Sequence, residues 1–107
     1  MITIEHKRYN QIEEINVNGH AGYAPIGKDI ICSAVSSVVY TLKIALEKAD
    51  KNKKALLLKC ELNEGDAVII FEPLSESTSA IVNALIDGLK ALSDSYPDYI
   101  GFLPCGA

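Results

Sequence analysis

The sequence predicts one α/β domain of the α+β kind, in which a mixed or antiparallel sheet packs against two amphipathic helices. Its 107 residues suit a single domain, residues 1–107. Short segments alternate between apolar and polar residues, as strands do, and two longer segments repeat apolar residues at helical spacing. Because hairpins and amphipathic helices cannot bury their apolar faces alone, we expect a sheet covered by both helices, in the order ββαββαβ.

The first half predicts a hairpin followed by a helix. Residues 2–8 and 12–19 alternate, with a polar turn between them. Residues 21–28 hold two glycines and a proline and predict a loop. Asp29 is a favourable N-cap for a helix that ends near Ala49. The residues expected to face inward are Ile2, Ile4, His6, Ile15 and Val17 in the strands and Ile31, Val35, Val38, Leu42, Ala45 and Ala49 in the helix.

The second half repeats this pattern without repeating the sequence. Strands are expected at residues 55–62 and 67–72, joined by the turn at 63–66. A helix begins around residues 75–77, and a short strand follows at 99–103. The residues expected to face inward are Leu56, Leu58, Cys60 and Leu62 in the strand and Ile81, Leu85, Leu89 and Leu92 in the helix.

Composition limits the class of protein. A net charge of −4 and a pI near 5.0 argue against direct binding of nucleic acid, although an acidic protein attracts basic substrates. Three cysteines without a CxxC pair indicate neither a disulfide framework nor a zinc site, so we expect a reducing compartment and no metal or cofactor. Charges from Glu5 onward are atypical of a signal peptide, and the apolar runs are short for a membrane span. We therefore expect a cytoplasmic protein.

Cys32 is the candidate nucleophile. With Asp29 as N-cap, it is third in the predicted helix, where free backbone N–H groups and the helix dipole favour a thiolate. The same N–H groups are suited to hold an oxyanion. His20, 12 residues upstream at a strand end, is suited to take the thiol proton. A lone cysteine in a helix is more often a packing residue, so position alone leaves both interpretations open.

Neighbouring polar residues have ordinary interpretations as well. Ser36, one turn beyond Cys32, either hydrogen-bonds in the site or is a solvent-facing or backbone-bonded serine. Asp29 is first of all a helix cap and could also orient His20. The other candidates are interpreted as structural: His6 at a strand end, Cys60 in the core, and Cys105 with no partner at a useful spacing.

The segment from Gly22 to Asp29, G-Y-A-P-I-G-K-D, nearly matches the phosphate-binding pattern G-x-x-x-x-G-K-[ST]. Its last residue is an aspartate, which brings negative charge towards the phosphates and lacks the hydroxyl that holds magnesium. The chain is also too short for the repeated βαβ units of such proteins. Nucleotide binding is therefore the weakest hypothesis.

A set of residues around Cys32 matches the motif of a known family: Gly19, His20, Ala21, Gly27, Asp29, Cys32, Ala34, Val35 and Ser36. With this motif, the chain resembles the ribosomal-processing cysteine proteases, the Prp family. The resemblance implies a small, homodimeric α/β protein with a Cys32–His20 dyad, and site roles for Asp29 and Ser36. It also implies a substrate, the N-terminal extension of large-subunit ribosomal protein L twenty-seven, cut after an apolar, phenylalanine-containing segment. Phage-encoded relatives cut capsid or scaffold proteins instead, and an inactive homologue would only bind the peptide.

The loop before the helix is where members of this family vary, and we expect it to contact substrate. Tyr23 either packs on an aromatic substrate side chain or is a surface tyrosine. Gly22, Pro25 and Gly27 let the loop move while limiting its shapes. We expect the loop to shift or become ordered when substrate binds.

Overall fold

The structure, a computed structural model, describes residues 1–25 and 28–104. The predicted ββαββαβ order is confirmed, and the ends of the elements differ from prediction by only a few residues. The elements are β1 (Ile2–Tyr9), β2 (Ile12–Asn18), α1 (Ile30–Lys51), β3 (Ala55–Asn63), β4 (Asp66–Pro73), α2 (Glu76–Ser95) and β5 (Ile100–Leu103).

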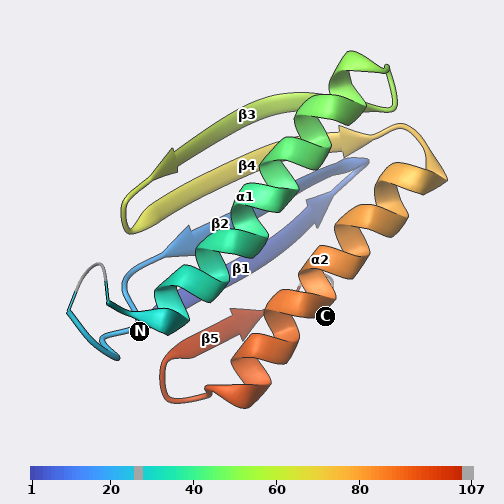
Figure 1. The fold of residues 1–107 in the computed structure, drawn as a ribbon. Coiled ribbons are helices and arrows are strands. Elements are labelled where there is room, and N and C mark those ends of the chain that lie inside the picture. The colour runs from blue at the N-terminus through green and yellow to red at the C-terminus, as the bar shows by residue number, and fades with distance from the viewer. Residues whose placement is uncertain (26–27, 105–107) are drawn as a thin grey trace.

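The described strands form one mixed sheet in the order β3-β4-β2-β1-β5. Neighbouring strands are antiparallel except β1 and β5, which are parallel. Both helices lie side by side on one face of this sheet (Figure 1). Extents of 40 × 29 × 18 Å fit such a two-layer domain, so the predicted fold class is confirmed.

The predicted inward positions are confirmed at Ile31, Val35 and Leu42 of α1 and at Leu89 of α2, but each helix also buries residues one position further along. In α1, Val39 and Leu46 are buried, each one residue beyond the predicted position. In α2, Val82 and Ile86 are buried, whereas the predicted Ile81 is 49% exposed. Both helices carry adjacent apolar pairs at these places, so a spacing of 3.6 residues fits two neighbouring stripes equally well. Only packing against the sheet decides between them.

Strand β3 departs most from the prediction. Its pairing with β4 shifts at Leu58, which is a β-bulge. Leu56 and Leu58 are 46% and 54% exposed, so the prediction that they face the core is wrong. Cys60 and Leu62, beyond the bulge, do pack against the core. A bulge breaks the two-residue alternation, and the sequence carries no clear sign of it.

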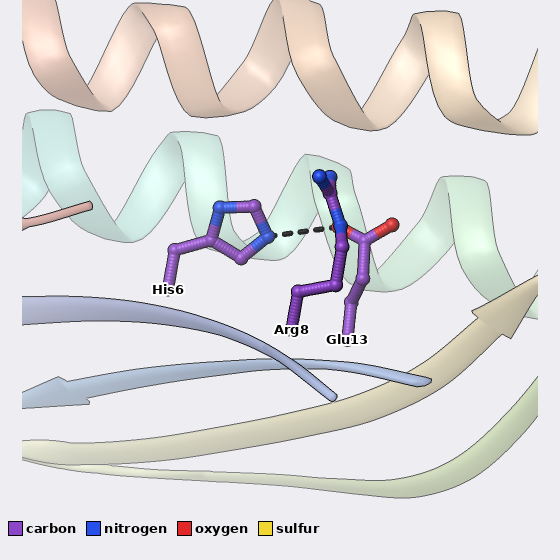
Figure 2. A network of polar contacts seen from close by, with 3 residues as sticks. All are labelled: His6, Arg8 and Glu13. Carbon is purple, nitrogen blue, oxygen red and sulfur yellow. Dashed lines mark hydrogen bonds and ion pairs between the residues drawn. The ribbon is translucent and has the colours of Figure 1, made fainter. Parts of the chain in front are cut away.

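A polar cluster lies between the sheet and the helices. Strand β1 continues to Tyr9, so His6 is inside the strand and buried, not at its end as predicted. Its Nε2 lies 2.8 Å from Oε1 of the buried Glu13, and Nη2 of Arg8 lies 3.4 Å from the same oxygen (Figure 2). Burial raises the pKa of Glu13, but the hydrogen bond with His6 and the charges of Arg8 and His6 outweigh it. The pKa of Glu13 is therefore lowered.

Helix α1 is long and apolar enough to cross a membrane, with a mean hydropathy of 1.6. The apolar runs of the sequence, taken without the helix, are too short to predict such a segment. One face of α1 nevertheless packs into the core, and the helix lies along the sheet in Figure 1. Its role as a core helix accounts for its apolar composition.

Candidate active site

The β2–α1 loop, the start of α1 and the β3–β4 turn come together at one end of the sheet (Figure 1). A groove of about 610 Å³ lies between them. Its walls are mostly apolar and include Val35 and Val39 of α1 and Leu62 of β3. Cys32 and His20 both line this groove, so the fold brings the two sequence-predicted residues to one place.

Asp29 determines where α1 begins. Its Oδ1 accepts hydrogen bonds from the N–H groups of Ile31 and Cys32, both at 3.0 Å. The predicted N-cap is therefore confirmed, and Cys32 is the third residue of the helix, as expected. The Cys32 side chain is half-buried, which leaves part of its surface open to the groove.

The expectation that the helix N-terminal amides are free is wrong for Ile31 and Cys32, and their role in holding an oxyanion stays a prediction. The amides of Ile31 and Cys32 donate to the Asp29 side chain, and that of Ser33 donates to the Asp29 carbonyl at 3.0 Å. The sulfur instead receives a hydrogen bond from the N–H of Ala21, at 3.3 Å. A cap strong enough to fix the helix start uses the same donors that an oxyanion would need.

Asp29 also ties the preceding loop to the helix. Its Oδ2 accepts from the N–H groups of Tyr23 and Ala24, at 3.1 and 3.4 Å. The hydrogen bond from Cys32, followed by those from Tyr23, Ala24 and Ile31, outweighs the effect of burial and lowers the pKa of Asp29. The carboxylate therefore stays ionised and holds the loop. A role for Asp29 in orienting His20 stays a prediction.

His20 follows the end of β2 and is exposed. The described contacts include no hydrogen bond between its ring and Cys32. The residue before it, Gly19, donates its N–H to the carbonyl of Gly65 at 2.9 Å. The β3–β4 turn thus supports the segment that carries His20, a contact that the sequence analysis missed because it joins distant segments.

The groove continues along the exposed face of α1. Ser36, one turn beyond Cys32, lines it as its spacing suggested, and its side chain is exposed. Tyr40, one further turn along, also lines it, and Lys43 Nζ lies 5.2 Å from the centre of its ring. Steps of four residues from Cys32 would have found Tyr40, because such residues share a helix face.

Only some residues of the predicted substrate-binding loop line the groove in the structure. Gly22 and Pro25 line the groove. Tyr23 is not among the lining residues that the structure describes; its ring packs edge-on against Tyr99, with centroids 5.4 Å apart. Gly27 lies outside the described residues.

The described charged side chains that line the groove are negative, and the second described cysteine lies elsewhere. Its described lining includes the carboxylates of Asp29, Glu64 and Asp66 but no lysine or arginine, so the groove is acidic. Within residues 1–25 and 28–104, no set of side chains suited to hold a metal ion is found. Burial raises the pKa of the Cys60 thiol, which favours its protonated form.

A cysteine and a histidine are the residue types that many cysteine proteases use as nucleophile and base, and both line this groove. Comparison with known families agrees, because the model described as cysteine protease Prp matches residues 1–101. The chain therefore belongs to the cysteine protease Prp family.

The similarity to known proteins covers nearly the whole chain. A Mycoplasma pneumoniae protein named ribosomal processing cysteine protease Prp is 29% identical over 106 residues, covering 94% of this chain and 90% of that protein. The protease Prp of S. aureus, solved with a covalently linked product peptide, has a TM-score of 0.79 at 16% identity, covering 97% and 99%. The SMU.848 protein of Streptococcus mutans has a TM-score of 0.69 at 20% identity, covering 98% and 94%. These structural likenesses show a shared fold.

Proposed function

We propose that this protease removes the N-terminal extension of large-subunit ribosomal protein L twenty-seven, with Cys32 as nucleophile and His20 as general base. The observation that carries the proposal is that both residues line one groove in a member of this family. The M. pneumoniae relative is named a ribosomal processing protease, and S. aureus Prp has been solved with a substrate peptide. The proposal includes a cytoplasmic location and a homodimer.

The proposed reaction has two halves. His20 takes the proton from Cys32, and the thiolate attacks the peptide carbonyl carbon to form a tetrahedral oxyanion. As this collapses, the C–N bond breaks and His20 gives its proton to the leaving amine. A water molecule, deprotonated by His20, then hydrolyses the thioester and returns the thiol. The N–H of Ala21, which contacts the sulfur at 3.3 Å, stabilises the thiolate before attack.

The groove suits an apolar peptide segment. Its walls include Val35, Val39 and Leu62, which offer apolar surface for a phenylalanine-containing segment. Glu64 and Asp66 place negative charge at the end formed by the β3–β4 turn. A substrate with basic residues beside its apolar segment therefore complements the groove.

The test compares two cysteines in the same chain. The purified protein is incubated with a peptide containing the apolar, phenylalanine-containing segment, and products are followed by mass spectrometry. We expect Cys32→Ala to abolish cleavage, because the sulfur forms the acyl-enzyme. The matched variant Cys60→Ala should cleave at the wild-type rate, because Cys60 packs against the core and does not line the groove.

Each other outcome has a definite meaning. Cleavage that persists in Cys32→Ala removes the proposed nucleophile. Binding of the peptide without cleavage by the wild-type protein supports the peptide-binding alternative. Cleavage of a phage capsid segment in preference to the ribosomal one assigns the substrate to a phage protein. Whether the same genome encodes that ribosomal protein with an N-terminal extension gives an independent check.

A further inference from the structure

The turn between β3 and β4 has a glycine where a side chain would be strained. Asn63 and Asp66 are the last paired residues, so Glu64 and Gly65 make the turn. Gly65 has φ of +76°, in the left-handed region that glycine adopts most easily. This turn lies beside the end of β2, because Asp66 also pairs with Asn18.

The His20 ring occupies the space that a side chain at position 65 would take. A Cβ built on Gly65 would lie 2.7 Å from Nε2 of His20, 3.2 Å from Cε1 and 3.5 Å from Cδ2. The nearest of these distances is shorter than real contacts allow, so ring and side chain could not both stay. The imidazole can therefore lie in this place only because residue 65 has no side chain.

The same turn fixes the backbone next to His20. The Gly65 carbonyl accepts the Gly19 N–H at 2.9 Å. Gly19 itself has φ of +95°, and a Cβ there would collide with the carbonyl oxygen of Met1. The main chain that enters His20 is thus tied to the turn by a hydrogen bond and lies so close to Met1 that position 19 has no room for a side chain. The ring and its backbone both rest on the β3–β4 turn.

We propose that Gly65 is a positioning residue for catalysis, which acts by leaving the space in which the His20 ring lies at the groove. The proposal rests on the proposed role of His20 as general base. A side chain at position 65 displaces the ring, which swings aside at little energetic cost because it is the end of an exposed side chain. The rate falls while the fold survives, since a displacement of about 1 Å in a catalytic group is enough to slow a reaction about 10²-fold.

Two substitutions separate the contact from backbone strain. Gly65→Ala and Gly65→Asn add the same Cβ, but asparagine tolerates positive φ better than alanine. We expect both variants to lose kcat by about 10²-fold with KM little changed. The melting temperature should be lower for Gly65→Ala than for Gly65→Asn. A kcat that recovers in Gly65→Asn along with the melting temperature would overturn the proposal, because strain alone would then explain the loss.

A double-variant cycle tests whether Gly65 acts through His20. The readout is the rate of Cys32 alkylation by iodoacetamide as a function of pH, which needs no cleavage. In the wild-type background, Gly65→Ala should slow alkylation near neutral pH and move its pH midpoint upward. In the His20→Ala background, the same substitution should change nothing further. An equal effect in both backgrounds would contradict the proposal.

The proposed protease function and the proposed positioning role of Gly65 would be contradicted by different results. If the wild-type protein cleaves no peptide but the alkylation cycle shows coupling between positions 65 and 20, the proposed function fails and the contact stands. If the peptide is cleaved at the wild-type rate by both Gly65 variants, the proposed function stands and the positioning role fails.

Discussion

The two histidines of this chain lie in opposite environments. His6 is buried between β1 and the helices, and its Nε2 lies 2.8 Å from the Glu13 carboxylate. His20 is exposed beside the groove, and its ring rests against Gly65. His6 also lines a smaller hollow of about 300 Å³ below α2. No described residue lines both that hollow and the groove.

The difference shows that a histidine–carboxylate pair is no sign of catalysis by itself. His6 and Glu13 have the short contact and the burial of an acid–base pair, but neither cysteine that the structure describes lines the hollow beside His6. His20 lacks such a carboxylate contact among the described residues, but it shares a groove with Cys32. Under the proposed function, access to Cys32 and to substrate makes His20 the catalytic histidine, whereas burial gives His6 a role in stability.

The largest expected effect is on catalysis at His20. His20→Ala should lower kcat/KM by about 10³-fold, because general acid–base catalysis contributes on the order of 10²–10⁴-fold. The melting temperature should stay near the wild-type value, since the side chain is exposed. Peptide cleavage and thermal unfolding measured on one preparation check both statements. A cleavage rate within a few-fold of the wild type would show that another group accepts the proton.

The next effect is on stability at His6. His6→Leu should lower the free energy of unfolding by about 2 kcal/mol, because Glu13 stays buried after losing its nearest partner and keeps only Arg8. The cleavage rate should stay near the wild-type value, because His6 does not line the groove. Urea unfolding and peptide cleavage are the measurements.

A second substitution sharpens the His6 result. The double variant His6→Leu with Glu13→Leu should regain stability, because replacing both members of a buried pair with apolar groups is often neutral or favourable. If the double variant is less stable than the single one, the buried charge of Glu13 does not account for the loss.

The smallest effect is a pH dependence at Glu13. Its pKa is lowered in the fold, so the unfolded chain binds more protons between that pKa and the usual value of 4.5. The stability from the Glu13 interactions is thus present above the usual value and is lost as pH falls through the folded pKa. Unfolding free energies from about pH 6 to pH 3 should fall less steeply for Glu13→Gln than for the wild type. Parallel curves would show that Glu13 is not responsible.

Local signals account for most of what was predicted about the fold. Turn residues and period-two alternation located the strands, and the Asp29 cap located the start of α1. The predictions failed where two arrangements share one pattern. Adjacent apolar pairs fit two stripes of α1, and the bulge at Leu58 shifts the faces of β3 without a sequence signal. These choices depend on what each face packs against.

The site was predicted in part. Cys32, His20 and Asp29 were found from a helix start, a strand end and a family motif, and the structure places the first two in one groove. The contact between His20 and Gly65 was not predicted, because the two residues are distant in sequence and meet through the pairing of β2 with β4. The hydrogen bonds from the amides of Ile31 and Cys32 to the Asp29 side chain were also not predicted, because the sequence does not show how many donors one cap accepts.

The sequence by itself determined the order of elements, the helix cap and the candidate nucleophile, because each depends on residues close together in the chain. The family motif also singled out His20, but only the tertiary structure decided what surrounds each histidine. His6 and His20 both come near the ends of alternating segments, so local pattern alone treats them alike. Sheet pairing buries one with Glu13 and sets the other against Gly65 beside Cys32, and these contacts join segments that the linear sequence keeps apart.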